Sequence, residues 1–334
     1  MRQKLGLALA AGLLSLVAAE LLIRLLGAAP QVYIIRKGRF QLSPNPKIGY
    51  EPAPLVYQGK ELSFYDFQGA SNSLGYRDVE HAVAKPPGVY RIVVLGDSIA
   101  AGLRVERFAD TFPALLGPLL AAKGLKAEVI SFAVSGYNTQ QEVETLKAKG
   151  LAYQPDLVLL AYSLGNRGRL DGEIMRTLLN EEQERRGVSG VRVNPILVKS
   201  ALYRFVRFRV LALKRVPQTD ARSDLDLVSR DTVAEYFGEL AALSRQHRFA
   251  VLVAVFPRFV RSFGYYRFGE QHAFVRELAR RNGFHLADLL APYARCRAAA
   301  SEPISVDTFH PSVYGHRCAA EALAAVIASD IAPK

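Results

Sequence analysis

The chain of 334 residues has only two cysteines and no tryptophan. Two thiols are too few for a disulfide-dense scaffold or for a zinc site built from four thiolates. The sequence also lacks a Walker loop, a glycine-rich dinucleotide fingerprint and a His-Glu-x-x-His motif, so it gives no support to a nucleotide-binding protein or a zinc protease. No internal repeat is present, which argues against a solenoid or a propeller. With 50% hydrophobic residues, the chain is too apolar for intrinsic disorder and long enough for one large α/β domain or two smaller ones.

Positive charge predominates in the sequence. Lysine and arginine number 43 against 31 acidic residues, which gives a net charge of +12. The surplus is concentrated in residues 185–215, here called the basic segment, because no acidic residue occurs between Glu184 and Asp220. The basic residues of this segment are Arg185, Arg186, Arg192, Lys199, Arg204, Arg207, Arg209, Lys214 and Arg215. Apolar residues interleave with them at roughly helical spacing, at Leu197, Leu202, Phe205, Phe208 and Leu211.

Two interpretations of the basic segment stay open. It forms either an interfacial helix that contacts anionic lipid headgroups, or an amphipathic helix packed on the protein with a solvated basic face. Nucleic acid is a third partner that a basic surface permits, but the chain has no recognition motif for it, and we do not expect it to bind nucleic acid.

The N-terminus carries a membrane-targeting pattern. Arg2 and Lys4 precede an uncharged, mostly apolar run over residues 5–19, and residues 21–26 continue it around Arg24. Glu20 lies four residues before Arg24, so on a helix the two side chains share a face and can pair. A run that reaches residue 26 is just long enough to span a bilayer, so we expect residues 1–28 to form a signal anchor that also acts as a transmembrane helix. The alternative is a cleaved signal peptide.

This orientation predicts the location of the remainder. Positive residues ahead of the apolar run keep that end in the cytoplasm, so the rest of the chain is expected to lie outside it, tethered to the membrane, or secreted if the signal is cleaved.

The rest of the chain divides in two. Residues 29–88 are rich in proline, glycine and tyrosine and read as an irregular lead-in or a small β-rich flap, whereas residues 89–331 alternate strands and helices around an insertion at about 167–220. The predicted strands are 90–95, 127–132, 157–163, 250–256 and 285–287. The predicted helices are 109–123, 139–149, 231–247, 270–282 and 311–328, with Thr139 and Glu142 as a capping box. Because most strands are apolar throughout, we expect a central parallel sheet covered by helices on both faces, a three-layer α/β/α sandwich.

Ligands of such sheets bind beyond the carboxyl ends of the strands, and three strand ends carry suitable residues. The first strand is followed by Gly96-Asp97-Ser98, where a tight turn exposes a hydroxyl and its own amide can point at an oxyanion. Gly136 follows the second strand and Asn166 the third, and each offers a further N–H donor. Each signal also has an ordinary meaning as a capped or glycine-containing turn.

A fourth candidate lies near the C-terminus. Asp307 precedes His310 by three residues, and a carboxylate so placed can orient an imidazole that acts as a general base. His316 raises the alternative of a metal site with these two residues, but no further ligand stands at useful spacing, and we expect no metal. Among the other histidines, His81, His247 and His272 are expected to be exposed and His285 to be a structural residue of a strand.

Together these blocks resemble the SGNH (GDSL-type) hydrolases over residues 89–331. The resemblance rests on Gly96-Asp97-Ser98, on Gly136, on Gly165-Asn166 and on Asp307 with His310, and the run 155–160 is also typical. Residues 72–78, Asn-Ser-Leu-Gly-Tyr-Arg-Asp, resemble the segment that precedes the domain in membrane-tethered bacterial members. One departure is Arg167, where the family commonly has aspartate after the asparagine.

The resemblance implies a flavodoxin-like fold and acyl transfer without a cofactor. Ser98 would be the nucleophile, His310 its base and Asp307 the residue that orients the base, with the oxyanion held by Ser98, Gly136 and Asn166. The expected substrate is an acyl ester of a carbohydrate or lipid, with an acetyl or other short acyl group, met on the periplasmic side of a bacterial inner membrane. Water as acceptor makes an esterase and a sugar hydroxyl makes an O-acyltransferase. A catalytically silent binding or scaffold protein is a third hypothesis, which stays open because Arg167 departs from the family pattern.

The two cysteines flank the loop with Asp307 and His310. In an exported protein, a disulfide between Cys296 and Cys318 would brace this loop, and we favour that pairing over two free thiols.

Overall fold

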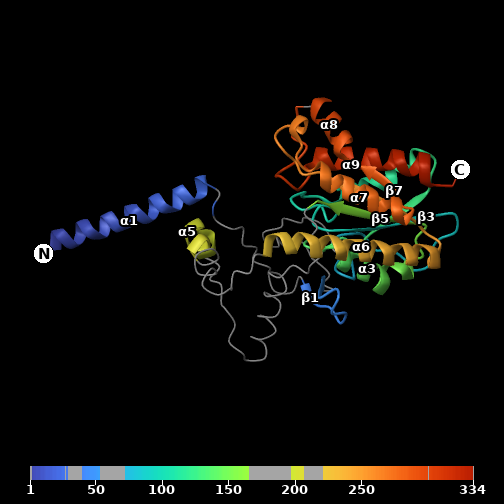
Figure 1. Ribbon diagram of the computed structural model, residues 1–334, viewed down its shortest axis with the longest axis horizontal. Helices are drawn as coiled ribbons and strands as arrows, with labels where there is room; N and C mark the ends of the chain where they lie inside the picture. Colours follow the sequence, from blue (N-terminus) through green and yellow to red (C-terminus); the bar gives the residue numbers. More distant parts are fainter. Residues whose placement is uncertain are drawn as a thin grey trace. The chain divides into compact units, whose positions relative to one another are not determined.

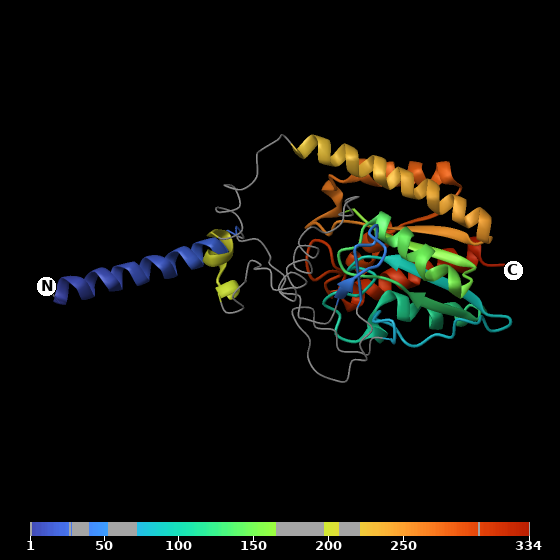
Figure 2. The same cartoon turned by 90° about the horizontal axis from the view of Figure 1, so that it is seen from below.

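The computed structural model describes residues 2–26, 28, 40–52, 72–164, 197–206, 221–299 and 301–333. The chain divides into two compact units (Figures 1 and 2). The smaller unit comprises Met1–Ile35 with Asn180–Arg222, and the larger comprises Arg36–Leu179 with Ser223–Lys334.

The larger unit is built on a five-stranded sheet of order β4-β3-β5-β6-β7, in which every neighbouring pair is parallel. The strands are β3 (Tyr90–Gly96), β4 (Ala127–Ser131), β5 (Leu157–Ser163), β6 (Ala250–Phe256) and β7 (His285–Asp288). Its helices are α2 (Phe112–Ala121), α3 (Thr139–Ala148), α6 (Ala221–His247, except its first two residues), α7 (Gly269–Asn282), α8 (Leu290–Ala299) and α9 (Val313–Val326). Figure 1 shows α9 on one side of the sheet and α3 and α6 on the other. The predicted three-layer α/β/α architecture is confirmed.

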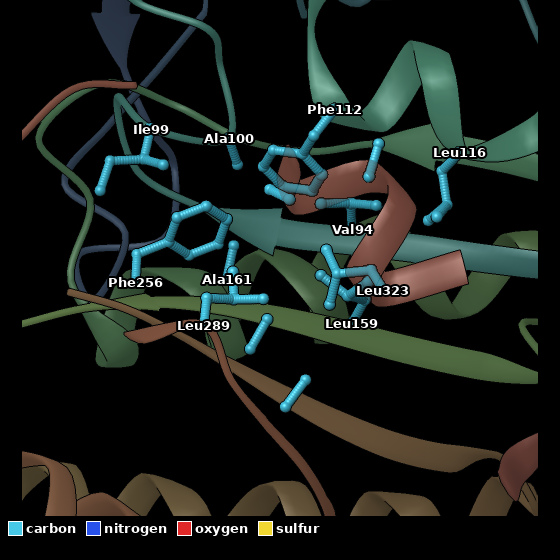
Figure 3. Packing of buried hydrophobic residues seen from close by; sticks show 14 of the residues in the cluster. Val94, Ile99, Ala100, Phe112, Leu116, Leu159, Ala161, Phe256, Leu289 and Leu323 are labelled. Carbon is cyan, nitrogen blue, oxygen red and sulfur yellow. The ribbon is translucent and has the colours of Figure 1, made fainter. Parts of the chain in front are cut away.

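The core explains why the strands are apolar along their whole length. On the face shown in Figure 3, alternate residues such as Val94 and Leu159 pack against Phe112 and Leu116 of α2 and Leu323 of α9. The residues between them in sequence point to the opposite face and are buried as well, at Val93, Leu95, Val158 and Leu160. Both faces are therefore closed to water, which removes the alternation of polar and apolar residues.

Two local predictions were wrong. Helix α3 is capped by Asn138, whose side chain accepts from the Gln141 N–H while the Gln141 side chain accepts from the Asn138 N–H, so the box lies one residue before the predicted pair Thr139 and Glu142. Asn138 has the extended backbone of an N-cap, whereas Thr139 is already helical. No helix was predicted where helix α8 lies. It begins where Asp288 accepts a hydrogen bond from the Leu290 N–H.

The described part of the lead-in forms a hairpin and a turn segment. Strand β1 (Phe40–Leu42) pairs antiparallel with β2 (Tyr50–Pro52). In residues 72–78, the Arg77 guanidinium donates to the main-chain carbonyls that follow Ser98, at Ala101, Gly102, Val105 and Glu106. The Asp78 carboxylate accepts from the Ser131 N–H at the end of β4. Side chains of the lead-in thus hold the loops at the carboxyl ends of β3 and β4.

The smaller unit contains α1 (Arg2–Leu25), the short 3-10 turn η3 (Leu197–Lys199) and α5 (Ala201–Phe205). Glu20 pairs with Arg24, as the spacing predicts, and accepts from the main-chain N–H groups of Ala201 and Leu202. Most of the basic segment lies outside the described residues. Within the described ranges, no helix has the combination of length and apolar character that crossing a bilayer requires. The predicted membrane-spanning anchor is therefore not confirmed.

Candidate active site

Ser98 lies in the turn that follows β3. At Gly96, the last residue of the strand, an added Cβ would stand 2.7 Å from the Ala100 Cβ and 3.0 Å from that of Ala161, so only glycine fits. After Ser98 the chain coils back, with the Leu103 N–H donating to the Ser98 carbonyl at 2.9 Å. Ile99 and Ala100 are buried in the apolar cluster of Figure 3. The residues beside Ser98 are thus anchored in the core, and the serine sits at the carboxyl edge of the sheet.

His310 reaches Ser98 from the other end of the domain. Its Nε2 lies 2.9 Å from the Ser98 Oγ, although 212 positions separate the two residues. Its Nδ1 lies 2.8 Å from the Asp307 Oδ2. The structure therefore places the three predicted residues in one hydrogen-bonded chain of hydroxyl, imidazole and carboxylate.

Asp307 is held as an anion by its own turn. Burial would raise the pKa of this carboxyl, but the hydrogen bonds from the His310 side chain and from the His310 and Phe309 N–H groups lower the pKa well below its ordinary value. Arg104, half-exposed, adds a cationic group 3.7 Å from the Asp307 Oδ2. A charged carboxylate at this place favours the imidazole form with its proton on Nδ1 and its lone pair on Nε2 toward the hydroxyl. This is the arrangement that a nucleophile and its base require.

Two amides are available for an oxyanion. The Ser98 and Gly136 N–H groups donate to no main-chain or side-chain acceptor in the described part of the chain. The segment before Gly136 runs beside β3, since the Val134 N–H donates to the Gly96 carbonyl, so Ser98 and Gly136 each follow this pair by two residues. Gly136 has a φ of +84°, a conformation that favours glycine. Gly165, Asn166 and Arg167 lie outside the described residues.

Sequence reasoning missed the role of Asp97. This carboxylate is buried beneath the turn, where Oδ1 accepts from the Ile99 N–H at 2.8 Å and Oδ2 accepts from the Ser163 hydroxyl at 2.7 Å. Burial raises the pKa of Asp97 against the lowering effect of these two donors. The position of Asp97 directly before Ser98 could have indicated a supporting role. Its partner Ser163, at the end of β5, could not be identified from the sequence.

Of the other five histidines, His81, His272 and His316 have buried side chains, whereas His247 is exposed, as predicted, and so is His285. His316 is fully buried and its Nδ1 accepts from the Phe112 N–H at 3.1 Å. In the described residues, no group of three His, Cys, Asp or Glu side chains is arranged to hold a metal ion. His81 and His272 were predicted to be exposed, yet their side chains are 9% and 3% exposed and pair with Asp78 and Asp288. His285 is exposed rather than structural.

A disulfide joins Cys296 of α8 to Cys318 of α9, with a Cα–Cα distance of 6.4 Å. The chain between the two cysteines includes Asp307 and His310. The link therefore closes the ends of the segment that supplies the base and its carboxylate.

The comparison with protein families agrees with this site. The model of the GDSL-like lipase/acylhydrolase family matches residues 94–318, which include Ser98, Gly136, Asp307 and His310. The chain belongs to this family. As a GDSL-like hydrolase, it is an ester hydrolase.

In a comparison with curated proteins, no protein matches this chain significantly. Among solved structures, it is similar to the acetyl xylan esterase AlAXEase, at 14% identity and a TM-score of 0.44, over 71% of this chain and 99% of that one. It is also similar to a variant of an acetyl-xylooligosaccharide esterase from Geobacillus, at 14% identity and a TM-score of 0.45, over 73% and 97%. A third similar structure is the esterase EstA from Pseudoalteromonas, at 14% identity and a TM-score of 0.40, over 71% and 96%.

Proposed function

We propose that the protein is a serine esterase that forms an acyl-enzyme at Ser98. The observation that carries the proposal is the 2.9 Å contact between the Ser98 Oγ and the His310 Nε2, with Asp307 behind the imidazole. A serine hydroxyl is a weak nucleophile until a neighbouring base removes its proton, and this contact supplies that base.

The reaction follows from the atoms in contact. The Ser98 Oγ bonds to the ester carbonyl carbon while its proton moves to the His310 Nε2. The resulting oxyanion accepts hydrogen bonds from the Ser98 and Gly136 amides, and from Asn166 if it matches its place in the family pattern. His310 then gives the proton to the departing alcohol as the ester C–O bond breaks. Water then bonds to the acyl carbon while its proton moves to the His310 Nε2. The bond between that carbon and the Ser98 Oγ breaks, His310 returns the proton to the Oγ, and the carboxylic acid leaves.

The test is turnover of chromogenic esters with acyl chains of increasing length, by the wild type and by Ser98→Ala. We expect the wild type to prefer short chains and Ser98→Ala to lose activity while it keeps the thermal midpoint of the wild type. Full activity of Ser98→Ala would refute the proposal.

The second candidate function is O-acyl transfer to a carbohydrate hydroxyl, since the acyl-enzyme can react with either acceptor. Product analysis separates the two functions, with acetylated polysaccharide as the acyl donor and unacetylated polysaccharide as the acceptor. An esterase releases free acid at the same rate with or without the acceptor, whereas a transferase moves the acyl group to the acceptor and releases less acid.

We also propose that the larger unit, here called the hydrolase unit, works outside the cytoplasm. The Cys296–Cys318 disulfide supports this location, because disulfides persist mainly in oxidising compartments. The basic residues ahead of the apolar N-terminal run support it as well. Protease added to intact spheroplasts should digest the hydrolase unit. Protection until the membrane is lysed would place the unit in the cytoplasm.

A further inference from the structure

A buried tyrosine of the lead-in hairpin contacts the loop that carries Gly136. Tyr50, the first residue of β2, is 0% exposed, and its hydroxyl donates to the main-chain carbonyl of Ser135 at 2.9 Å. The hairpin lies before the sheet in the chain, and 85 positions separate the two residues. The lead-in therefore reaches the carboxyl edge of the sheet with a polar group.

The acceptor of this hydrogen bond is part of the same peptide group as the Gly136 N–H. No peptide bond in the described part of the chain is cis. In a planar trans peptide the C=O and the N–H point in opposite directions, so a donor that fixes the Ser135 carbonyl also fixes the direction of the Gly136 N–H. That N–H points away from Tyr50, and like the Ser98 N–H it has no acceptor among the described groups.

We infer that Tyr50 is a positioning residue that aims the Gly136 amide at the oxyanion. The inference rests on the proposed function, in which Gly136 is an oxyanion donor. Orientation is the main effect, because an oxyanion donor contributes only if it points at the charge that develops in the transition state. A hydrogen bond to the carbonyl also polarises the peptide group and makes its N–H a stronger donor.

The position of the Tyr50 hydroxyl is itself well determined. Its ring makes edge-to-face contacts with Phe40 and Tyr137, at centroid distances of 5.5 and 5.3 Å. The Gln141 side chain donates to the Ile48 carbonyl at 2.8 Å and ties the hairpin to α3. These contacts do not involve the Tyr50 hydroxyl, so Tyr50→Phe removes the hydrogen bond and keeps the packing.

Tyr137 supplies a matched control. It is also buried, and its hydroxyl donates at 2.7 Å to a main-chain carbonyl, that of Tyr50. Tyr137→Phe therefore deletes the same chemical group from the same aromatic cluster, but the acceptor belongs to the hairpin and not to the peptide group of Gly136. Both variants should lose a similar amount of thermal stability.

The experiment compares these two variants in the full chain with a chromogenic short-chain ester. Tyr50→Phe should lower kcat about tenfold, less than the loss of a whole donor, with KM within about twofold of the wild type. Tyr50→Phe should also slow inactivation by an activated phosphonate by a similar factor. When the phosphonate reacts with Ser98, its phosphoryl oxygen takes the position of the oxyanion. Tyr137→Phe should keep both rates within about twofold of the wild type. Replacement of Tyr50 by p-aminophenylalanine, which retains a donor at the ring position, should restore most of kcat.

Equal kinetics of Tyr50→Phe and Tyr137→Phe would overturn the inference, as would a p-aminophenylalanine variant no faster than Tyr50→Phe. The proposed function fails separately. If Ser98→Ala is inactive and Tyr50→Phe is as fast as its control, only the role of Tyr50 is refuted. If Ser98→Ala is active, the acyl-enzyme itself is refuted.

Discussion

The Ser163 hydroxyl donates to the Asp97 Oδ2 at 2.7 Å, so the last residue of β5 holds the residue directly before Ser98. Ser163 is 3% exposed. The contact ties the turn of the proposed nucleophile to the neighbouring strand, and it is made between a hydroxyl donor and a carboxylate whose pKa burial raises.

Ser163→Ala should therefore destabilise the protein in a pH-dependent way. It leaves a buried carboxylate oxygen without its donor, which costs about 1–3 kcal/mol. The cost applies to the charged form of Asp97, so it should be largest at alkaline pH and shrink as the pH falls and Asp97 takes up a proton. Urea unfolding of the wild type and the variant across pH measures this. A cost that stays constant with pH would contradict it, and Ser244→Ala, which removes a hydroxyl that donates to the Phe249 carbonyl, provides a control.

Gly102→Ala should be one of the more damaging small substitutions in the chain. Gly102 has a φ of +70°, and an added Cβ would stand 2.3 Å from the Thr111 Cγ2 and 2.9 Å from the Arg77 Nη1. The left-handed backbone costs about 1–2 kcal/mol and the overpacking adds about 1–3 kcal/mol. Because Arg77 also binds the carbonyls around this glycine, the displacement should reach the Ser98 turn and lower kcat.

Gly88→Ala separates the two contributions. Gly88 has the same φ of +70°, but an added Cβ would meet no atom within 4 Å. It should cost only the backbone part, about 1–2 kcal/mol, and leave kcat unchanged. Equal losses of unfolding free energy in the two variants would show that the contacts with Thr111 and Arg77 are unimportant.

Removal of the disulfide should lower stability without removing activity at low temperature. The link closes a segment of 22 residues, for which the chain-entropy relation gives about 3 kcal/mol. In urea unfolding, the double variant Cys296→Ala/Cys318→Ala should have an unfolding free energy lower than that of the wild type by about 3 kcal/mol. The hydrogen bonds of Asp307 and His310 do not involve the cysteines, so kcat measured at about 10 °C, where the variant stays folded, should equal that of the wild type. A count of two free thiols in the denatured, non-reduced wild type would refute the link.

The parts of the fold that sequence predicts well are those set by burial. The strands from Tyr90 to Phe256 are apolar because both sides of the sheet are covered. Continuous apolar runs of this kind can be recognised from the sequence alone. Ser98 was a candidate because strand ends of a parallel sheet collect ligand-binding residues, and Asp307 with His310 because their spacing suits a carboxylate and its imidazole. The resemblance to the SGNH (GDSL-type) hydrolases joined the three into one predicted site.

The supporting contacts were not predictable, for a physical reason. The partners of Ser163, Arg77 and Tyr50 lie far away in the sequence, and a serine, an arginine or a tyrosine is common in surface loops. The errors at His81 and His272 have a different origin. Neighbouring charges were taken as signs of exposure, whereas Asp78 and Asp288 are the partners that allow these imidazoles to be buried.

His316 should make the protein less stable in acid. Burial lowers the pKa of this imidazole from 6.5 to about 3, so the folded protein keeps it neutral. Below pH 6.5 the unfolded chain binds a proton there that the folded chain cannot, and the contribution of His316 to stability is lost as the pH falls toward about 3, at about 1.4 kcal/mol per pH unit. Above pH 6.5 the contribution is constant.

His316→Gln tests this expectation, because glutamine can still accept from the Phe112 N–H but does not titrate. The variant should be less stable than the wild type at pH 8, since it loses the stacking of the imidazole on Phe112. The difference in unfolding free energy between the two proteins should narrow as the pH is lowered, and comparison at each pH cancels the titration of all other groups. A difference that does not change between pH 7 and pH 4 would show that His316 takes up its proton equally in both states.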